Sequence, residues 1–134
     1  MEGGGGGGRH LDSAAKIIIA DDMPAMLTGL RRALAQLGFT HVIEAADGAE
    51  AFAALGANPD TALVISDWNM EPMDGLALLG AVRADARFRK LPFILISADA
   101  GAVREKAARA GVSLVLAKPF DAEGLRKAIA EAAA

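Results

Sequence analysis

Five short apolar runs, each followed by a segment with helical spacing, limit what this chain can fold into more than any other feature. The run TALVIS at 61–66 is apolar enough to suit a strand that is buried on both faces of a sheet. Strands that alternate with helices are typical of a parallel sheet whose connecting helices cover both faces. We therefore predict an α/β fold with five parallel strands. The predicted strands are KIIIA at 16–20, HVIEA at 41–45, TALVIS at 61–66, LPFILIS at 91–97 and VSLVLA at 112–117.

The segments between these runs carry apolar residues at every third or fourth position, which is the spacing of one helix face. The first predicted helix begins near Pro24, because proline is tolerated in a first turn, and Gly38 ends it. The other four are marked by DGAEAFAAL at 47–55, by Leu76, Leu79 and Val82, by Val103, Ala107 and Ala110 before Gly111, and by DAEGLRKAIAEA at 121–132.

The length of the chain favours one domain. It has 134 residues, 53% of them hydrophobic, which is enough to bury one core but not two. We expect residues 16–134 to form that domain. Residues 1–15 include a run of glycines with nothing to bury, so we predict a flexible leader or tag. The run is not a phosphate-binding loop, because no strand precedes it and no Gly-Lys-Ser/Thr follows it.

Composition excludes several classes of protein. The absence of cysteine rules out disulfides and thiolate metal sites, and it fits a reducing compartment such as the cytoplasm. No apolar run approaches the roughly 20 residues that a membrane span needs. A net charge of -3 gives no general case for binding DNA or an anionic membrane. Arg83, Arg87, Arg89 and Lys90 form a local basic cluster, which a solvated helix end explains most simply.

Polar side chains follow four of the predicted strands. Functional groups of an open parallel sheet gather beyond the carboxyl ends of its strands. Asp21 and Asp22 follow the first strand, Asp67 follows the third, and Ser97 is the last residue of the fourth. Three carboxylates at one edge would repel one another, so we expect a cation there. Magnesium suits oxygen ligands and is typically held by one or two carboxylates, whereas zinc lacks its usual cysteine ligands here.

Lys118, which follows the fifth strand, completes a site suited to phosphoryl transfer. A metal and an ammonium group spread the charge of the transferred phosphoryl group while a carboxylate attacks it. Asp67 is the predicted nucleophile, because a rigid buried strand delivers it to the edge. Simpler roles exist, since Asp21 and Asp22 suit a helix amino terminus and Ser97 suits a helix cap. Trp68 is expected to be partly exposed beside the site.

Four motifs together resemble a known family. IIIADD, VISDWNMEPMDGLALL, ILISADA and LAKPF, in that order, resemble the receiver domain of two-component response regulators. SDWNM and VRAD are most similar to the CheY-like single-domain regulators of chemotaxis. The resemblance covers about residues 16–134. It implies a flavodoxin-like (βα)5 fold, doubly wound, with strand order 2-1-3-4-5.

The resemblance also implies a role for each polar residue at the edge. It implies a Mg²⁺ cofactor and a protein that is a phosphoacceptor, assisting its own phosphorylation and dephosphorylation, rather than an enzyme. The bond before Pro119 is expected to be cis. The implied residues are Asp67 as phosphoacceptor, Asp22 as a direct magnesium ligand, Asp21 as a ligand through water, Asn69 as a ligand through its backbone carbonyl, Ser97 as the switch hydroxyl, Lys118 as the phosphoryl-binding lysine, and Asn69 and Asp99 as positions that tune dephosphorylation.

Two positions depart from the family pattern. Family members commonly have proline four residues after the phosphoacceptor, where this chain has Glu71, and proline follows at Pro72. Three residues before the lysine, where many regulators carry Tyr or Phe, this chain has Val115. A switch that couples Ser97 to an inward-turning ring is therefore not expected in its usual form.

The implied partners are a histidine kinase or phosphotransfer protein, and a downstream protein that binds the surface of the fourth helix, fifth strand and fifth helix. Two alternatives stay open: a degenerate receiver that binds a partner or nucleotide through residues 83–90, and a receiver excised from a larger hybrid kinase or regulator. A haloacid dehalogenase-like phosphatase would also use a strand-end aspartate and magnesium. Such enzymes carry a second aspartate where this chain has Asn69.

Overall fold

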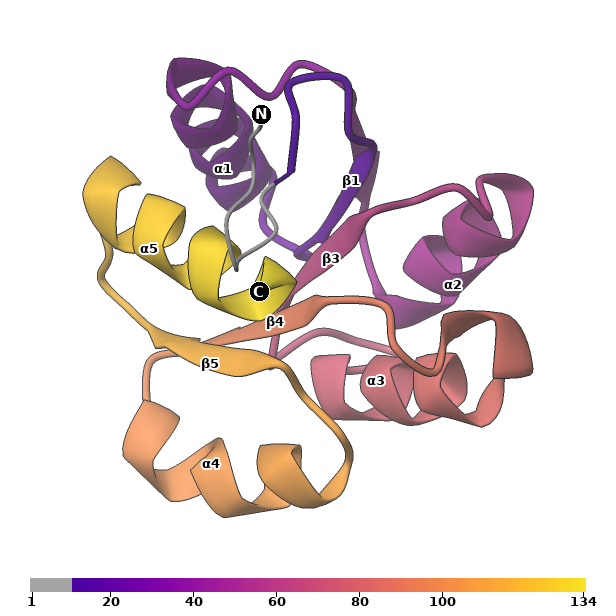
Figure 1. Ribbon diagram of the computed structural model, residues 1–134. Coiled ribbons are helices and arrows are strands. Elements are labelled where there is room, and N and C mark those ends of the chain that lie inside the picture. The colour runs from indigo at the N-terminus through magenta and orange to yellow at the C-terminus, as the bar shows by residue number, and fades with distance from the viewer. Residues whose placement is uncertain (1–10) are drawn as a thin grey trace.

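The computed structural model describes residues 11–134, which form a five-stranded parallel sheet with helices on both faces (Figure 1). The strand order is β2-β1-β3-β4-β5, as the family resemblance implied. All five predicted strands and five predicted helices are present. They are β1 (Ile17–Ala20), α1 (Pro24–Gln36), β2 (Val42–Ala45), α2 (Gly48–Ala57), β3 (Leu63–Asp67), α3 (Gly75–Ala84), the short 3-10 helix η1 (Ala86–Phe88), β4 (Phe93–Ser97), α4 (Ala100–Arg109), β5 (Leu114–Ala117) and α5 (Ala122–Ala133).

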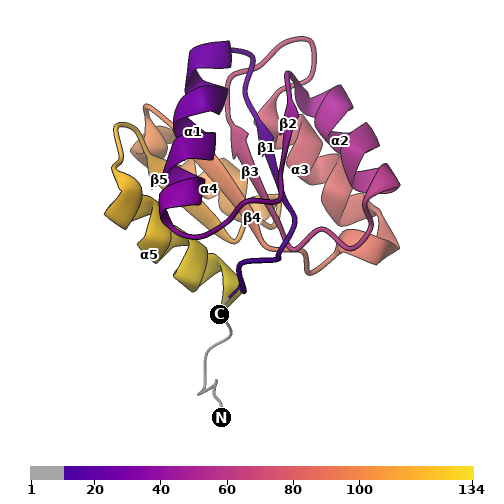
Figure 2. The same ribbon diagram turned by 90° about the horizontal axis from the view of Figure 1, so that it is seen from above.

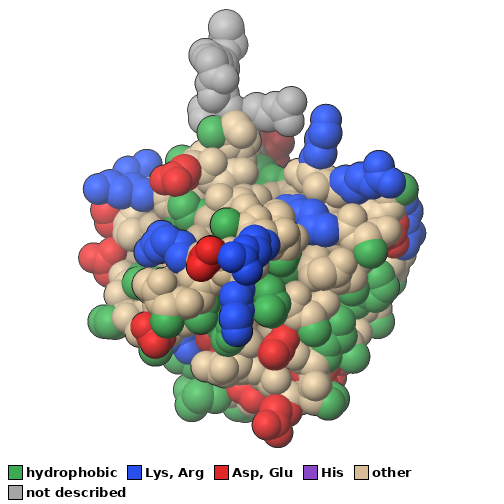
Figure 3. All heavy atoms as spheres, turned by 90° about the horizontal axis from the view of Figure 1, so that it is seen from below, with side chains coloured by type: hydrophobic (Ala, Val, Ile, Leu, Met, Phe, Trp, Pro, Cys, Tyr) green, Lys and Arg blue, Asp and Glu red, His purple; other side chains and the backbone are tan. Residues whose placement is uncertain are grey.

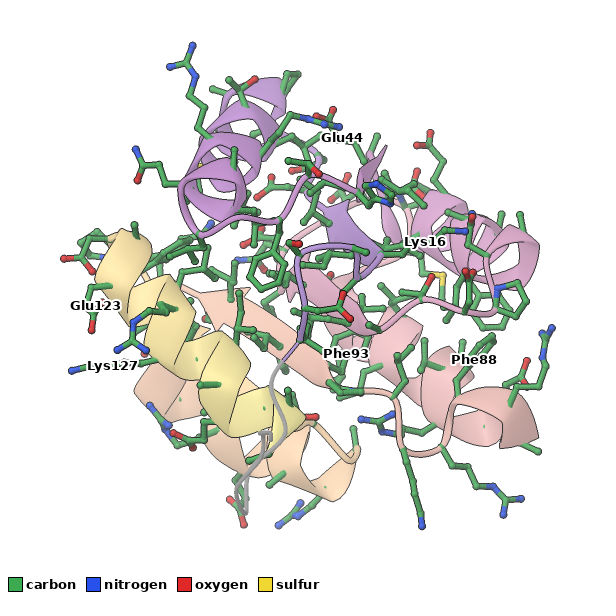
Figure 4. All side chains as sticks on the ribbon, turned by 45° about the horizontal axis from the view of Figure 1, so that its top comes forward. Lys16, Glu44, Phe88, Phe93, Glu123 and Lys127 are labelled. Carbon is green, nitrogen blue, oxygen red and sulfur yellow. The ribbon has the colours of Figure 1, made fainter. Side chains whose placement is uncertain are left out.

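The helices form one layer on each side of the sheet (Figure 2). Ile17 and Ile19 of β1 belong to the apolar cluster under α1 and α5, whereas Ile18 belongs to the cluster under α2, α3 and α4. Successive strand side chains point to opposite faces, so a strand covered on both sides needs apolar residues throughout. This requirement explains the uninterrupted apolar runs. Phe93 at the start of β4 is fully buried in the second cluster (Figure 4).

The register of the central strands brings their carboxyl ends to one edge. Asp67 of β3 is paired with Ile96 of β4, and Ser97 of β4 is paired with Ala117 of β5. The hydrogen bonds continue past the strand ends, because the Trp68 N–H donates to the Ile96 carbonyl at 2.8 Å and the Lys118 N–H donates to the Ser97 carbonyl at 2.9 Å. Residues 67, 97 and 118 are thereby held side by side.

The helix boundaries follow local signals in the sequence. Asp47, Asp74 and Asp121 cap α2, α3 and α5, each accepting a hydrogen bond from a backbone N–H three residues later. Gly38 and Gly111 follow α1 and α4 with φ of 96° and 92°, a conformation that glycine adopts without steric cost. Both glycines were predicted to end these helices.

The buried face of α3 differs from the expected one. Leu78 is 1% exposed and Leu79 is fully buried, while Leu76 is only partly buried. Leu76, Leu79 and Val82 follow one another at steps of three, and such a row drifts around a helix of 3.6 residues per turn. Gly75, Leu78, Leu79 and Val82 instead have the spacing i, i+3, i+4, i+7, which keeps one face toward the sheet.

The leader predicted for residues 1–15 is described only in part, since residues 1–10 lie outside the described residues. Leu11 is partly buried against the cluster beneath α1 and α5. The Ala15 N–H donates to the Asp12 carbonyl at 3.1 Å, which forms a turn before β1. Within residues 11–134, no helix is long and apolar enough to cross a membrane.

Candidate functional site

The centre of the candidate site is an ion pair between the ends of two strands. Asp67 is the last residue of β3 and is 5% exposed. Its Oδ1 lies 2.8 Å from Nζ of Lys118, which directly follows β5. The lysine therefore reaches across the end of β4 to the aspartate. A buried carboxylate of this kind needs a charged partner, and the ammonium group supplies one.

Asp21 and Asp22 lie beside this pair, at the end of β1. Asp21 is 2% exposed, and its carboxylate accepts a hydrogen bond from the Met23 N–H at 2.9 Å. Burial raises the pKa of Asp21, and the nearby charges of Asp67 and Asp22 add to the rise, while the Met23 bond and Lys118 oppose it. Asp22 is exposed. The predicted grouping of Asp21, Asp67 and Lys118 is therefore present.

The loop between β3 and α3 forms the outer wall of the site. Asp22 and Asn69 line an open hollow of about 470 Å³, together with Met70, Glu71, Pro72 and Asp74. The sequence alone did not predict how Glu71 affects this loop. Glu71 is exposed and lines the same hollow. The Glu71-Pro72 peptide bond is cis, and so is the Lys118-Pro119 bond, as the family resemblance implied.

Ser97 lies on β4, between the strands that carry Asp67 and Lys118. It is 3% exposed, and its hydroxyl accepts a hydrogen bond from the Asp99 N–H at 3.0 Å. Asp99 is itself the N-cap residue of α4, so Ser97 does not cap the first turn of that helix. Val115 on β5 is buried, in register with Leu95 of β4.

The oxygen atoms at this edge fit a magnesium ion better than a soft metal. The available groups are the carboxylates of Asp21, Asp22 and Asp67 and the carbonyl of Asn69, all of them hard ligands. Among the described residues, no three acidic or histidine side chains converge as a ready-made metal cage. Asp67 instead forms an ion pair with Lys118, and among the described residues the three carboxylates expected from the sequence do not form such a cage. One or two carboxylates and water suffice to hold Mg²⁺. The charges of Asp67 and Asp22 both raise the pKa of Asp21, so a cation bound among these three carboxylates would reduce their repulsion.

Sequence reasoning missed one support of the site. The Gly48 N–H at the start of α2 donates to the Met73 carbonyl at 2.9 Å, and the Gly75 N–H donates to the Trp68 carbonyl at 3.0 Å. These two bonds hold the loop that carries Asn69. The capping pair Asp47-Gly48 is visible in the sequence, but its contact with Met73 is not. Trp68 is partly buried and packs against the cluster beneath α2, α3 and α4.

Comparison with known proteins identifies the family. Residues 17–130 match the response regulator receiver domain. The chain belongs to this family. The receiver is 39% identical to chemotaxis protein CheY1 of Helicobacter pylori over 113 residues, which cover 84% of this chain and 91% of the relative. It is 41% identical to chemotaxis protein CheY of Pseudomonas aeruginosa over 116 residues, which cover 85% and 92%.

A solved structure agrees with this assignment. CheY4 of Vibrio cholerae superposes on the receiver with a TM-score of 0.82 and 28% sequence identity, covering 89% of this chain and 98% of that chain. The receiver is therefore CheY-like, and its class is that of signalling proteins in chemotaxis and two-component pathways. The match favours neither the degenerate-receiver alternative nor the phosphatase alternative.

Proposed function

We propose that this receiver accepts a phosphoryl group on Asp67 in a Mg²⁺-dependent reaction, with a histidine kinase or phosphotransfer protein as the donor. The observation that carries the proposal is the buried Asp67 carboxylate, paired at 2.8 Å with Lys118 at the strand edge where Asp21 and Asp22 also lie. A strand-end carboxylate beside an ammonium group and further acids suits in-line attack on phosphorus.

Each residue has a distinct part in this chemistry. A carboxylate oxygen of Asp67 forms the new bond to phosphorus as the bond to the donor breaks. Lys118 holds a phosphoryl oxygen and balances its charge. Asp22, Asp67 and the Asn69 carbonyl would hold Mg²⁺ directly, and Asp21 would do so through water. The metal, when bound, offsets the negative charge that gathers on the phosphoryl oxygens.

Phosphorylation is proposed to change a protein-binding surface formed by α4, β5 and α5. Ser97 is the link, because its hydroxyl is bonded to the N–H of Asp99 at the start of α4. A phosphoryl oxygen that drew the Ser97 hydroxyl away would release this bond and alter the entry to α4. Val115 has no aromatic ring that could follow the movement of the Ser97 hydroxyl. The change in the protein-binding surface therefore depends on α4 itself. Asn69 and Asp99 are exposed beside the site and are proposed to tune the loss of phosphate.

Trp68 makes the proposal testable without a label. It is the single tryptophan of the chain, directly follows Asp67 and is partly buried. We expect saturable changes in its fluorescence when Mg²⁺ is added and again when acetyl phosphate is added. The second change should be absent in Asp67→Ala. A magnesium response without any acetyl phosphate response in the wild-type protein would contradict phosphorylation of Asp67.

A further inference from the structure

The charges of this chain are distributed unevenly along the sequence. Residues 11–82 carry ten acidic and three basic side chains, a net charge of -7, and residues 83–113 carry seven basic and three acidic ones, a net charge of +4. Seen from below, several Lys and Arg side chains lie on one face of the molecule, with Asp and Glu side chains among them and along its lower part (Figure 3). The basic cluster noted at 83–90 is therefore part of a larger feature.

Arg83 joins two segments that are far apart in the sequence. Its Nε donates to the Gly111 carbonyl at 2.8 Å, and its Nη1 donates to the Phe88 carbonyl at 2.8 Å. The first contact is to the turn after α4, and the second is to η1. Arg83 thus fixes η1 and the following residues beside the last turn of α4. We call the resulting group the basic surface; its members are Arg83, Arg87, Arg89, Lys90, Lys106 and Arg109.

Only part of the positive charge on this surface is neutralised. Arg87 pairs with Asp85 at 2.8 Å, and Arg109 pairs with Glu105 at 2.7 Å. Within residues 11–134, Arg89, Lys90 and Lys106 are exposed and have no acidic side chain within ion-pair distance; these three positions are the open cations of the basic surface. The Arg87 guanidinium also lies 4.7 Å from the centre of the Phe88 ring, which favours a defined position for it.

The small size of the basic surface favours one kind of anionic partner over others. A nucleic acid binds through a long row of phosphates, and three open cations match only a short part of such a row. Polybasic membrane sites usually present about four to eight free cations, more than this surface offers. A short acidic protein segment can match three open cations.

We propose that the basic surface docks an acidic segment of a partner protein. The surface includes η1, which precedes β4, and the end of α4, which precedes β5, so it lies at the amino edge of the sheet, opposite Asp67. A segment bound there leaves the edge that carries Asp67 and Lys118 open. Docking there leaves Asp67 accessible to a phosphoryl donor, so it can hold the receiver near a partner before phosphoryl transfer.

The test uses a fluorescein-labelled oligoglutamate peptide and the full chain, with binding followed by fluorescence anisotropy. Binding should weaken as salt is added, because the charges are exposed. The triple variant Arg89→Glu/Lys90→Glu/Lys106→Glu should lose about 3- to 100-fold in affinity, since each exposed ion pair is worth about 1.5- to 5-fold. The matched control is Arg32→Glu/Arg126→Glu/Lys127→Glu, whose charges lie on α1 and α5; Lys127 projects from α5 away from the core (Figure 4).

Both triple variants have a net charge of -9. In the control, Arg126→Glu also removes the ion pair with Glu123, a contact on α5 outside the basic surface. The proposal requires the control to keep most of its affinity. An equal loss in both triple variants would overturn it, because net charge alone would then explain binding. Tighter binding to an oligothymidylate or to phosphatidylserine vesicles than to the peptide would overturn it as well, as would no binding at low salt. Circular dichroism confirms that each variant is folded.

Discussion

At the scale of single residues, the Asp21 carboxylate that is proposed to help hold the metal also lowers the stability of the metal-free fold. The side chain is almost fully buried, next to Asp67 and Asp22, and its raised pKa means that the folded chain binds a proton there more tightly than the unfolded chain does. Its contribution to stability therefore falls as the pH rises from the ordinary value of 3.8 through the raised value. Above that range, the ionised carboxylate destabilises the metal-free fold.

Replacing this charge should stabilise the protein while impairing metal binding. We expect Asp21→Asn to raise the free energy of unfolding in EDTA at pH 7 by on the order of 1 kcal/mol, since the amide keeps the bond from Met23 without the repulsion. The gain should vanish below about pH 3.8, where wild-type Asp21 is also neutral. Urea unfolding at several pH values measures this.

Asp60→Asn is the matched control, because it removes the same charge from a residue whose pKa is lowered by Lys16. This variant should show no such gain at pH 7. A variant at Asp21 that is no more stable than the wild type at pH 7 would mean that neither burial nor the neighbouring charges oppose the ionisation of Asp21.

At the scale of elements, the start of α2 supports the loop that carries Asn69. A Cβ atom on Gly48 would lie 2.7 Å from Cγ of Met73 and 2.8 Å from the Met73 carbonyl oxygen, so the loop would have to move. Gly56, on the same helix, has no such neighbour within 4 Å. Replacing each glycine by alanine in turn therefore distinguishes a displacement of the loop, expected only at Gly48, from the general effect of alanine on helix stability.

We expect Gly48→Ala to weaken Mg²⁺ binding by about tenfold, the scale seen when a residue that orients a metal ligand is changed. Gly56→Ala should leave Mg²⁺ affinity unchanged and raise the stability of the fold by up to about 1 kcal/mol, because alanine favours a helix over glycine. Titration of Trp68 fluorescence with Mg²⁺ gives the affinity, and urea unfolding gives the stability. Equal affinities in the two variants would show that α2 does not position the loop.

At the scale of the whole molecule, the parallel sheet collects one site from several separate strands. Asp21 and Asp22 come from β1, Asp67 from β3, Ser97 from β4 and Lys118 from β5. Unfolding disperses all of these groups. A cation that needs them together therefore binds the folded chain and stabilises it by mass action.

Mg²⁺ should accordingly raise the free energy of unfolding by about 2.7 kcal/mol when its concentration is a hundred times its Kd. Thermal unfolding with MgCl2, compared with NaCl at equal ionic strength, measures the effect. Asp22→Ala should abolish it, whereas Asp60→Ala, which removes a carboxylate far from the hollow that Asp22 lines, should retain it. An equal rise in both variants would place the ion elsewhere.

The sequence by itself determined the order and type of the elements and the residues at the strand ends. Apolar runs, the 3.6-residue spacing, Pro24, Gly38 and Gly111 act over a few neighbouring residues, so they can be read locally. With the family motifs, these signals also led to the correct strand order. The position of Asp67 at the end of an apolar run placed it, with Asp21 and Asp22, among the polar residues of that edge.

Only the tertiary structure decided which distant groups meet. The pairing of Asp67 with Lys118, the contact between Gly48 and Met73, and the bond from Arg83 to Gly111 join residues separated by 25 to 51 positions. The burial of Leu78 instead of Leu76 likewise depends on how α3 is rotated against the sheet. Such contacts arise from the packing of whole elements, and no local pattern of residues specifies them.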